Sequence, residues 1–180
     1  MDSQKLIYGL YNLTELEQLI NSQPTFWRPL VFTNGCFDLV HAGHIRYLWV
    51  AKSLGRSLVV GLNSDSSVQN IKPQTKGYPM RPIVPQTQRA EVLGALKPVD
   101  GVVIFNETTA NKIIERLKPD IYVKGGDYSV KTLPEASKVK EYGGKISLIQ
   151  IEVPTSTTAI INSILSVSYT HLTLPTILSV

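Results

Sequence analysis

Short apolar stretches alternate with helical patterns through most of this 180-residue chain. Five stretches are expected to form β-strands, at residues 30–32, 58–62, 100–105, 120–123 and 145–151. The second of them, Leu-Val-Val-Gly-Leu, is apolar throughout, which is typical of a strand covered on both faces. Each stretch is short and bounded by turn residues, so the pattern favours buried strands over long core helices.

Apolar residues at helical spacing predict a helix before the first strand and further helices between and after the strands. The first helix is expected after a capping box at residues 14–17, and Pro24 is expected to end it. Ser64 or Asp65 is expected to cap a short helix after the second strand. The apolar positions of the longer helices are Leu16, Leu19 and Ile20; Ile45, Leu48 and Trp49; Ala90, Leu93 and Leu96; Ile113, Ile114 and Leu117 after a cap at Thr108 or Thr109; and Ile160, Ile161, Ile164 and Leu165.

This alternation predicts an α/β fold, a five-stranded parallel sheet with helices on both faces. In such a sheet the turns after the strands open at one edge, where ligands bind. We expect an N-terminal helical extension at residues 1–28 and one catalytic domain at residues 29–166. Residues 167–180 carry no charge and resemble translated sequencing-adapter read-through, so a non-native tail is expected there, with an edge strand or a partner-binding tail as the alternative. His171 receives no role.

The composition of the chain excludes only a few classes of function. Apolar residues make up 43% of the chain and charged residues 18%, which indicates a folded domain. The net charge of +4 suits an anionic small ligand as well as nucleic acid. However, no basic run interleaved with aromatic residues is present, so nucleic-acid binding is not expected. The single cysteine, Cys36, and the lack of a signal peptide or bilayer-length apolar run predict a cytoplasmic protein that binds no membrane.

The most informative stretch joins the first strand to the helix that follows it. It contains an Asn34-Gly35 turn and then His41-x-Gly43-His44 at the expected helix start. The free N–H groups of a helix start attract anions, and a glycine lets a phosphate approach the backbone closely. The two histidines could instead belong to a metal site or cap the helix, but no third metal ligand is near them in the sequence.

A second candidate anion site lies at residues 156–158, where Ser-Thr-Thr hydroxyls precede the last helix. The proline-rich segment 71–85 between the two candidates carries Lys72, Lys76 and Arg81, which could form a lid over a triphosphate or a solvated loop. The pattern is neither a P-loop nor a dinucleotide-binding turn. These residues therefore predict a nucleotide or phosphate ligand and do not specify it further.

Residues 33–44, Thr-Asn-Gly-Cys-Phe-Asp-Leu-Val-His-Ala-Gly-His, resemble the first motif of the cytidylyltransferase-like nucleotidyltransferases. Within that superfamily the chain is most similar to the heptose 1-phosphate adenylyltransferases, the ADP-heptose synthase family. Residues 60–68, the Lys-Gly-Gly-Asp-Tyr at 124–128 and the Ser-Thr-Thr at 156–158 continue the similarity in the same order. One departure is Pro154-Thr155, where relatives usually carry a glycine and another residue.

The resemblance implies a Rossmann-like nucleotidyltransferase fold and the transfer of AMP from ATP to D-glycero-β-D-manno-heptose 1-phosphate, with Mg²⁺ held by the phosphates and by no protein ligand. It also implies a role in lipopolysaccharide synthesis, a homodimer, and functional pairing with a separate heptose kinase. The implied catalytic residues are His41, His44 and Lys72. The implied nucleotide-binding residues are Thr33, Asn34, Gly35, Cys36, Phe37, Gly43, Arg89, Lys124, Gly126, Asp127, Ser156, Thr157 and Thr158. The implied substrate-binding residues are Asp38, Asn63, Asp65, Lys76 and Arg81.

Several alternatives remain open from the sequence. Lys72 and Lys76 compete for the family's loop lysine, Arg89 could pair with Glu91 or Asp100 at the surface, and Asp38 could only brace its turn. The 124–127 segment could be a plain tight turn. A cytidylyltransferase for glycerol or ethanolamine phosphate, a non-catalytic nucleotide-binding module and one half of a bifunctional enzyme are the other functions considered. Met1 and the N-terminal helix favour a free-standing form over the last of these.

Overall fold

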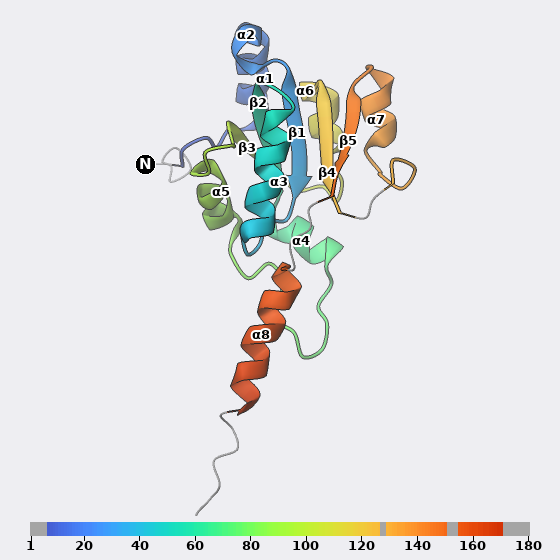
Figure 1. The fold of residues 1–180 in the computed structure, drawn as a ribbon. Coiled ribbons are helices and arrows are strands. Elements are labelled where there is room, and N and C mark those ends of the chain that lie inside the picture. The colour runs from blue at the N-terminus through green and yellow to red at the C-terminus, as the bar shows by residue number, and fades with distance from the viewer. Residues whose placement is uncertain (1–6, 127–128, 151–154, 171–180) are drawn as a thin grey trace, which may run out of the picture.

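The computed structural model describes residues 7–126, 129–150 and 155–170, and they contain one sheet with helices on both faces (Figure 1). The strands are β1 (Leu30–Gly35), β2 (Ser57–Asn63), β3 (Gly101–Phe105), β4 (Ile121–Gly125) and β5 (Lys145–Ile149). Their order is β3-β2-β1-β4-β5, and every neighbouring pair is parallel. The predicted five-stranded parallel sheet is therefore confirmed. The winding reverses between β1 and β4, and a reversal of this kind leaves a crevice for a ligand beyond the strand ends.

Helices pack on both faces of the sheet, as predicted (Figure 1). One face carries α3 (Ala42–Ser53) and α5 (Gln86–Gly94), and the other carries α1 (Leu13–Ser22), α2 (Pro24–Trp27), α6 (Asn111–Leu117) and α7 (Ala136–Glu141). The remaining two, α4 (Asp65–Ile71) and α8 (Thr157–Thr170), lie at the carboxyl edge, and α8 leads away from the sheet. None of the helices in the described ranges is long and apolar enough to cross a bilayer.

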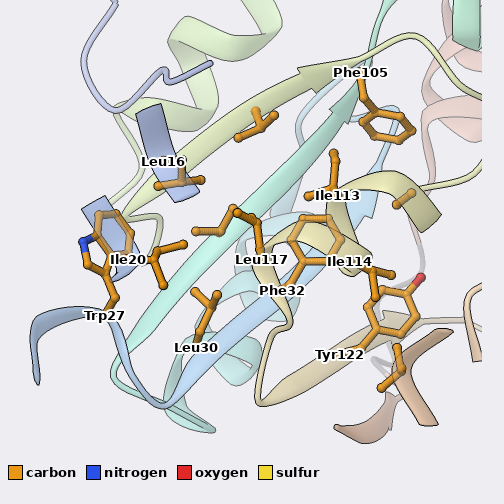
Figure 2. Packing of buried hydrophobic residues seen from close by; sticks show 14 of the residues in the cluster. Leu16, Ile20, Trp27, Leu30, Phe32, Phe105, Ile113, Ile114, Leu117 and Tyr122 are labelled. Atoms are coloured by element: carbon orange, nitrogen blue, oxygen red, sulfur yellow. The ribbon is translucent and has the colours of Figure 1, made fainter. Parts of the chain in front are cut away.

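Two apolar clusters hold these layers together, because successive strand residues point to opposite faces. Phe32 lies in the cluster that α1 and α6 cover, where it stacks on Tyr122 at a ring-centroid distance of 6.1 Å (Figure 2). The preceding residue, Val31, lies in the cluster under α3 and α5. Burying each large apolar side chain stabilises the fold by about 1.5–3 kcal/mol, so the two clusters fix the strand ends that carry the site.

The ends of several helices differ from the predictions. The capping box of α1 lies at Asn12 and Glu15, where the Asn12 side chain accepts the Glu15 N–H at 2.9 Å, two residues earlier than predicted. Pro24 lies after the end of α1, as predicted, and it is also the first residue of α2. Neither threonine caps α6, because the N-cap position is Ala110, which has no capping side chain. The N–H of Ala110 donates to the Glu135 carboxylate at 3.2 Å. The helices α2 and α7 were not predicted.

Two of the apolar positions identified in the helices are largely exposed. Trp49 in α3 is 47% exposed and Ile164 in α8 is 60% exposed, whereas the buried positions of α3 are Leu48 and Ala51 and Ile161 is buried in α8. The predicted boundary at residue 166 falls inside α8, which continues to Thr170. Residues 171–180 lie outside the described residues, so the tail stays a prediction.

Candidate active site

A cavity of about 470 Å³ opens at the carboxyl edge of the sheet, beyond the ends of β1, β2 and β4. Segments that are far apart in the sequence meet around it, which is what the predicted convergence of the turns requires. Its lining residues are Asn34, Gly35, Cys36, Phe37, Asp38, His44, Asn63, Ile71, Lys72, Arg81, Thr108, Thr109, Lys124, Gly125, Thr132, Leu133, Pro134, Glu135 and Thr157.

The two histidines lie together at the start of α3. His41 is the N-cap of this helix, and its Nδ1 accepts the N–H of Gly43 at 3.2 Å. The neutral His41 ring therefore carries its proton on Nε2. The rings of His41 and His44 have centroids 3.9 Å apart, and Phe37 packs against His44 at a centroid distance of 5.2 Å. The start of α3 thus presents imidazoles and free backbone N–H groups toward the same region.

Both imidazoles are neutral near pH 7 before a ligand binds. Burial lowers the pKa of His44 to about 4, with further lowering by His41 and Lys72 and an opposing contribution from the Leu39 carbonyl. Burial also lowers the pKa of His41. A bound polyanion has the opposite effect on the pKa, because an opposite charge favours the protonated ring. A negatively charged ligand would therefore raise both pKa values and would be stabilised by the protonated rings.

The start of α8 approaches this pair from the other end of the sequence. Ser156 is the N-cap, and its Oγ accepts the N–H of Ala159 at 3.1 Å, so this hydroxyl serves the helix. The Thr157 hydroxyl donates to the Leu39 carbonyl at 3.5 Å, and Thr157 lines the cavity. Thr158 lies in an adjoining cleft of about 270 Å³ that Lys72 also lines. The two predicted anion-binding helix starts are therefore neighbours.

The structure assigns Arg89 a different role from the predicted phosphate contact. Its side chain is fully buried, does not line the cavity, and pairs with Asp65 at 2.7 Å. The guanidinium also donates to three backbone carbonyls, those of Val84 at 2.8 Å, Cys36 at 2.6 Å and Asn63 at 2.8 Å. It therefore holds the ends of β1 and β2 to the start of α5. Its carboxylate partner is neither of the two surface residues considered from the sequence.

Asp38 acts mainly on the loop before α5, which is the bracing role left open by the sequence. Its carboxylate accepts the N–H groups of Ile83 at 2.8 Å and Val84 at 3.0 Å and pairs with the Arg81 guanidinium. The Asp38 side chain is 1% exposed and that of Arg81 14%. Asp38 and Arg81, both predicted to bind the substrate, therefore form part of the cavity wall, and their charged groups pair with each other.

Other predicted site residues lie in the wall or outside the cavity. Thr33 is buried, and its hydroxyl shares a 2.6 Å hydrogen bond with Tyr47. Asn63 lines the cavity, and its amide donates to Ser67 at 2.9 Å. The predicted residues that do not line the cavity are Thr33, His41, Gly43, Asp65, Lys76, Arg89, Gly126, Ser156 and Thr158. Asp127 lies outside the described residues. The structure favours Lys72 over Lys76 as the loop lysine.

At the end of β4 the predicted residues Lys124 and Asn34 lie together with residues that the sequence analysis missed as site residues. The Nζ of Lys124 donates to Asn34 Oδ1 at 3.0 Å, and the Tyr122 hydroxyl donates to the same oxygen at 2.8 Å. Burial lowers the pKa of Lys124, and the nearby Glu135 carboxylate opposes that shift. Glu135 and Thr109 carry no motif of their own, because the fold brings the starts of α6 and α7 to this edge only through long-range packing.

Similarity searches find relatives over most of the chain. A family model described as cytidylyltransferase-like matches residues 32–174. Bifunctional protein HldE of Citrifermentans bemidjiense is 46% identical over 155 residues, which are 86% of this chain and 31% of the relative. The HldE of Syntrophotalea carbinolica is 47% identical over 138 residues, which are 77% of this chain and 27% of the relative. The chain therefore spans less than a third of the length of these curated relatives.

Solved structures share the same architecture. A lipopolysaccharide core biosynthesis protein from Thermoplasma volcanium superposes with a TM-score of 0.55 at 31% identity, over 69% of this chain and 97% of that one. A pantoate–β-alanine ligase from Francisella tularensis, solved with an ATP ligand and β-alanine, superposes with a TM-score of 0.56 at 16% identity, over 90% of this chain and 79% of that one, which shows the fold alone. The family model settles the wider relationship that the first motif predicted: the chain belongs to the cytidylyltransferase-like family.

Proposed function

We propose that this chain is an adenylyltransferase that moves AMP from ATP to D-glycero-β-D-manno-heptose 1-phosphate, giving ADP-heptose and pyrophosphate. The observation that carries the proposal is the close His41–His44 pair at the start of α3, of which His44 lines a cavity together with Lys72, Lys124 and Thr157 of α8. The resemblance of residues 124–128 to the heptose branch supports this acceptor, as does the similarity to a lipopolysaccharide core biosynthesis protein.

In the proposed reaction a phosphate oxygen of the sugar phosphate attacks the α-phosphorus of ATP in line. The bond from that phosphorus to the bridging oxygen breaks, and its electron pair leaves with pyrophosphate. A phosphate is already nucleophilic at neutral pH, so the protein needs no covalent intermediate, and Cys36 receives no catalytic role. The protein contributes positioning and charge stabilisation. The imidazole N–H groups would donate to the phosphates and to the charge that builds up on the leaving group.

Magnesium would accompany the nucleotide in this proposal. In the parts of the chain that the structure describes, no group of three or more His, Cys, Asp or Glu side chains is placed to hold a metal ion. The acidic residues beside the first motif and α4 are engaged, Asp38 with Arg81 and Asp65 with Arg89. The phosphates would therefore be the main ligands, and a bound Mg²⁺ would neutralise part of their charge.

Three further features belong to the same proposal. The relatives carry the name bifunctional and are more than three times as long as the matched region, which supports functional pairing with a sugar kinase activity. The proposal also includes a homodimer, which the family resemblance supports, and a cytoplasmic location, which the single cysteine supports. Sedimentation and cell fractionation test them.

A substrate panel tests the function directly. Purified protein is incubated with ATP or CTP and with heptose 1-phosphate, glycerol 3-phosphate or ethanolamine phosphate, and pyrophosphate release is measured. We expect release above background only with ATP and the heptose phosphate. A strong preference for CTP with glycerol or ethanolamine phosphate would replace the proposed reaction with the related one. Binding of ATP without pyrophosphate release from any pair would indicate a non-catalytic nucleotide-binding module.

A further inference from the structure

A buried carboxylate belongs to the wall of a cavity whose proposed substrates are both polyanions. Glu135 is 3% exposed, and it lines the cavity together with Lys124 and Thr109. Within the described part of the chain, its carboxylate makes one hydrogen bond, which it accepts from the N–H of Ala110 at 3.2 Å. An ionised carboxylate can accept about four hydrogen bonds, so most of its capacity remains for a ligand.

Charge decides which part of a ligand can lie against Glu135. A phosphate group placed there would meet a like charge in a partly dehydrated cavity, which is strongly unfavourable. The phosphates have better partners near His44, Lys72 and the start of α8. Glu135 comes from the start of α7, after β4, whereas His44 comes from α3, after β1. The carboxylate therefore suits a neutral, hydrogen-donating part of a substrate.

The neighbours of Glu135 favour a polyhydroxylated ligand over a nucleobase. Thr108, Thr109 and Thr132 line the same cavity, and Thr109 precedes Ala110, whose N–H donates to Glu135. Lys124 adds a cation close enough to interact with the carboxylate. Hydroxyls, a carboxylate and an ammonium group match the alternating donors and acceptors of a sugar, whereas a planar base prefers apolar faces with a few polar contacts.

We propose that Glu135 is a specificity-determining residue that accepts hydrogen bonds from the hydroxyl groups of the sugar phosphate acceptor, with the Thr109 hydroxyl as its companion. This inference rests on the proposed adenylyl transfer and adds to it the surface that recognises the acceptor. It assigns the sugar to the side of the cavity formed by the starts of α6 and α7, and it leaves ATP recognition independent of Glu135.

Steady-state kinetics of Glu135→Gln test the proposal by pyrophosphate release, varying each substrate while the other is saturating. The substitution keeps the size of the side chain and the oxygen that accepts from Ala110. We expect the KM for heptose 1-phosphate to rise about tenfold, because a charge-assisted hydrogen bond becomes a neutral one. The KM for ATP is expected to stay within about twofold. Glu141→Gln, on the exposed side of α7, is the matched control and should change neither constant.

Every outcome of this series decides the question. An unchanged KM for the sugar phosphate, or a rise in the KM for ATP, would overturn the assignment of Glu135. If Glu135→Gln does not fold, as a thermal melt would show, the near-isosteric Thr109→Val decides instead, with an expected rise of a few-fold in the sugar phosphate KM alone and rejection if that KM is unchanged. A wild-type protein that turns over no sugar phosphate would reject the proposed function itself, which is a separate result.

Discussion

At the carboxyl edge of the sheet, the buried charged side chains that anchor loops differ from the ionisable side chains that face the cavity in the partners that they have. Asp38 and Arg89 spend their hydrogen bonds on backbone groups and on an ion-pair partner. His44 faces the cavity with a strongly lowered pKa, and Lys72 adds to that lowering. Side chains of the first kind should govern stability and those of the second kind turnover.

The largest expected effect is on the anchoring side. Arg89→Met removes a fully buried guanidinium and leaves three backbone carbonyls and the Asp65 carboxylate without their donor. The Asp65 side chain is 37% exposed and can be rehydrated, so most of the cost comes from the carbonyls, each of which costs about 1–3 kcal/mol when left unsatisfied. We therefore expect the free energy of unfolding to fall by about 3–5 kcal/mol. Urea denaturation measures it. Lys112→Met, which breaks a surface pair with Glu107, is the control and should cost about 0–1 kcal/mol. Equal losses in the two variants would remove the distinction between the two kinds of charge.

On the cavity side, His44→Ala should show the opposite behaviour. Removing one donor to developing negative charge typically lowers kcat by about 10²–10³-fold, so we expect a loss of that size in pyrophosphate release. The melting temperature at pH 7.5 should change little, because the side chain faces the cavity. Undiminished turnover would show that the histidines are not the catalytic groups. A large fall in the melting temperature of the ligand-free variant would instead show that His44 is one of the anchoring residues.

The acid stability of the free protein should also depend on His44. Its folded-state pKa is about 4, against an ordinary value of 6.5, so the unfolded chain binds the proton more readily than the folded one. Stability should therefore fall as the pH drops from 6.5 toward 4, by about 1–2 kcal/mol after allowance for solvent screening. The His44→Gln variant should lose less stability over that window. Denaturation midpoints at a series of pH values compare the two slopes, and parallel slopes would contradict the assignment.

Most of the fold follows from the sequence because its signals are local. Apolar runs and helical spacing predict all five strands, and Ser64 caps α4 as predicted. The capping box of α1 was misplaced because Asn12 and Glu15 satisfy the same spacing pattern two residues earlier. Short helices such as α2 and α7 carry too few positions to show a period, so they were missed.

The candidate site is harder to predict, because the sequence does not show whether the side chain of a charged residue points toward the cavity or toward the protein interior. Arg89 lies in α5, after the 71–85 segment that was considered as a lid over a triphosphate, yet tertiary packing turns it toward the backbone of Cys36 and Asn63. Glu135 belongs to no motif, and only the packing of α7 beside α6 brings it to the cavity. The position of His41 at a helix start was predictable, because it depends only on the neighbouring residues in the sequence.

The smallest expected effect separates the two loop lysines. Lys72 lines the cavity and contributes to the lowered pKa of His44, whereas Lys76 lies on the same proline-rich segment outside the cavity. Lys72→Met should therefore lower kcat/KM for ATP about tenfold, the value of a single charged contact of about 1.4 kcal/mol, and Lys76→Met should change it by less than about twofold. Both positions are exposed, so neither change should alter the melting temperature. A larger loss from Lys76→Met would mean that the segment rearranges over bound nucleotide, and the lysine that faces the cavity in the free protein would not be the one that contacts the phosphates.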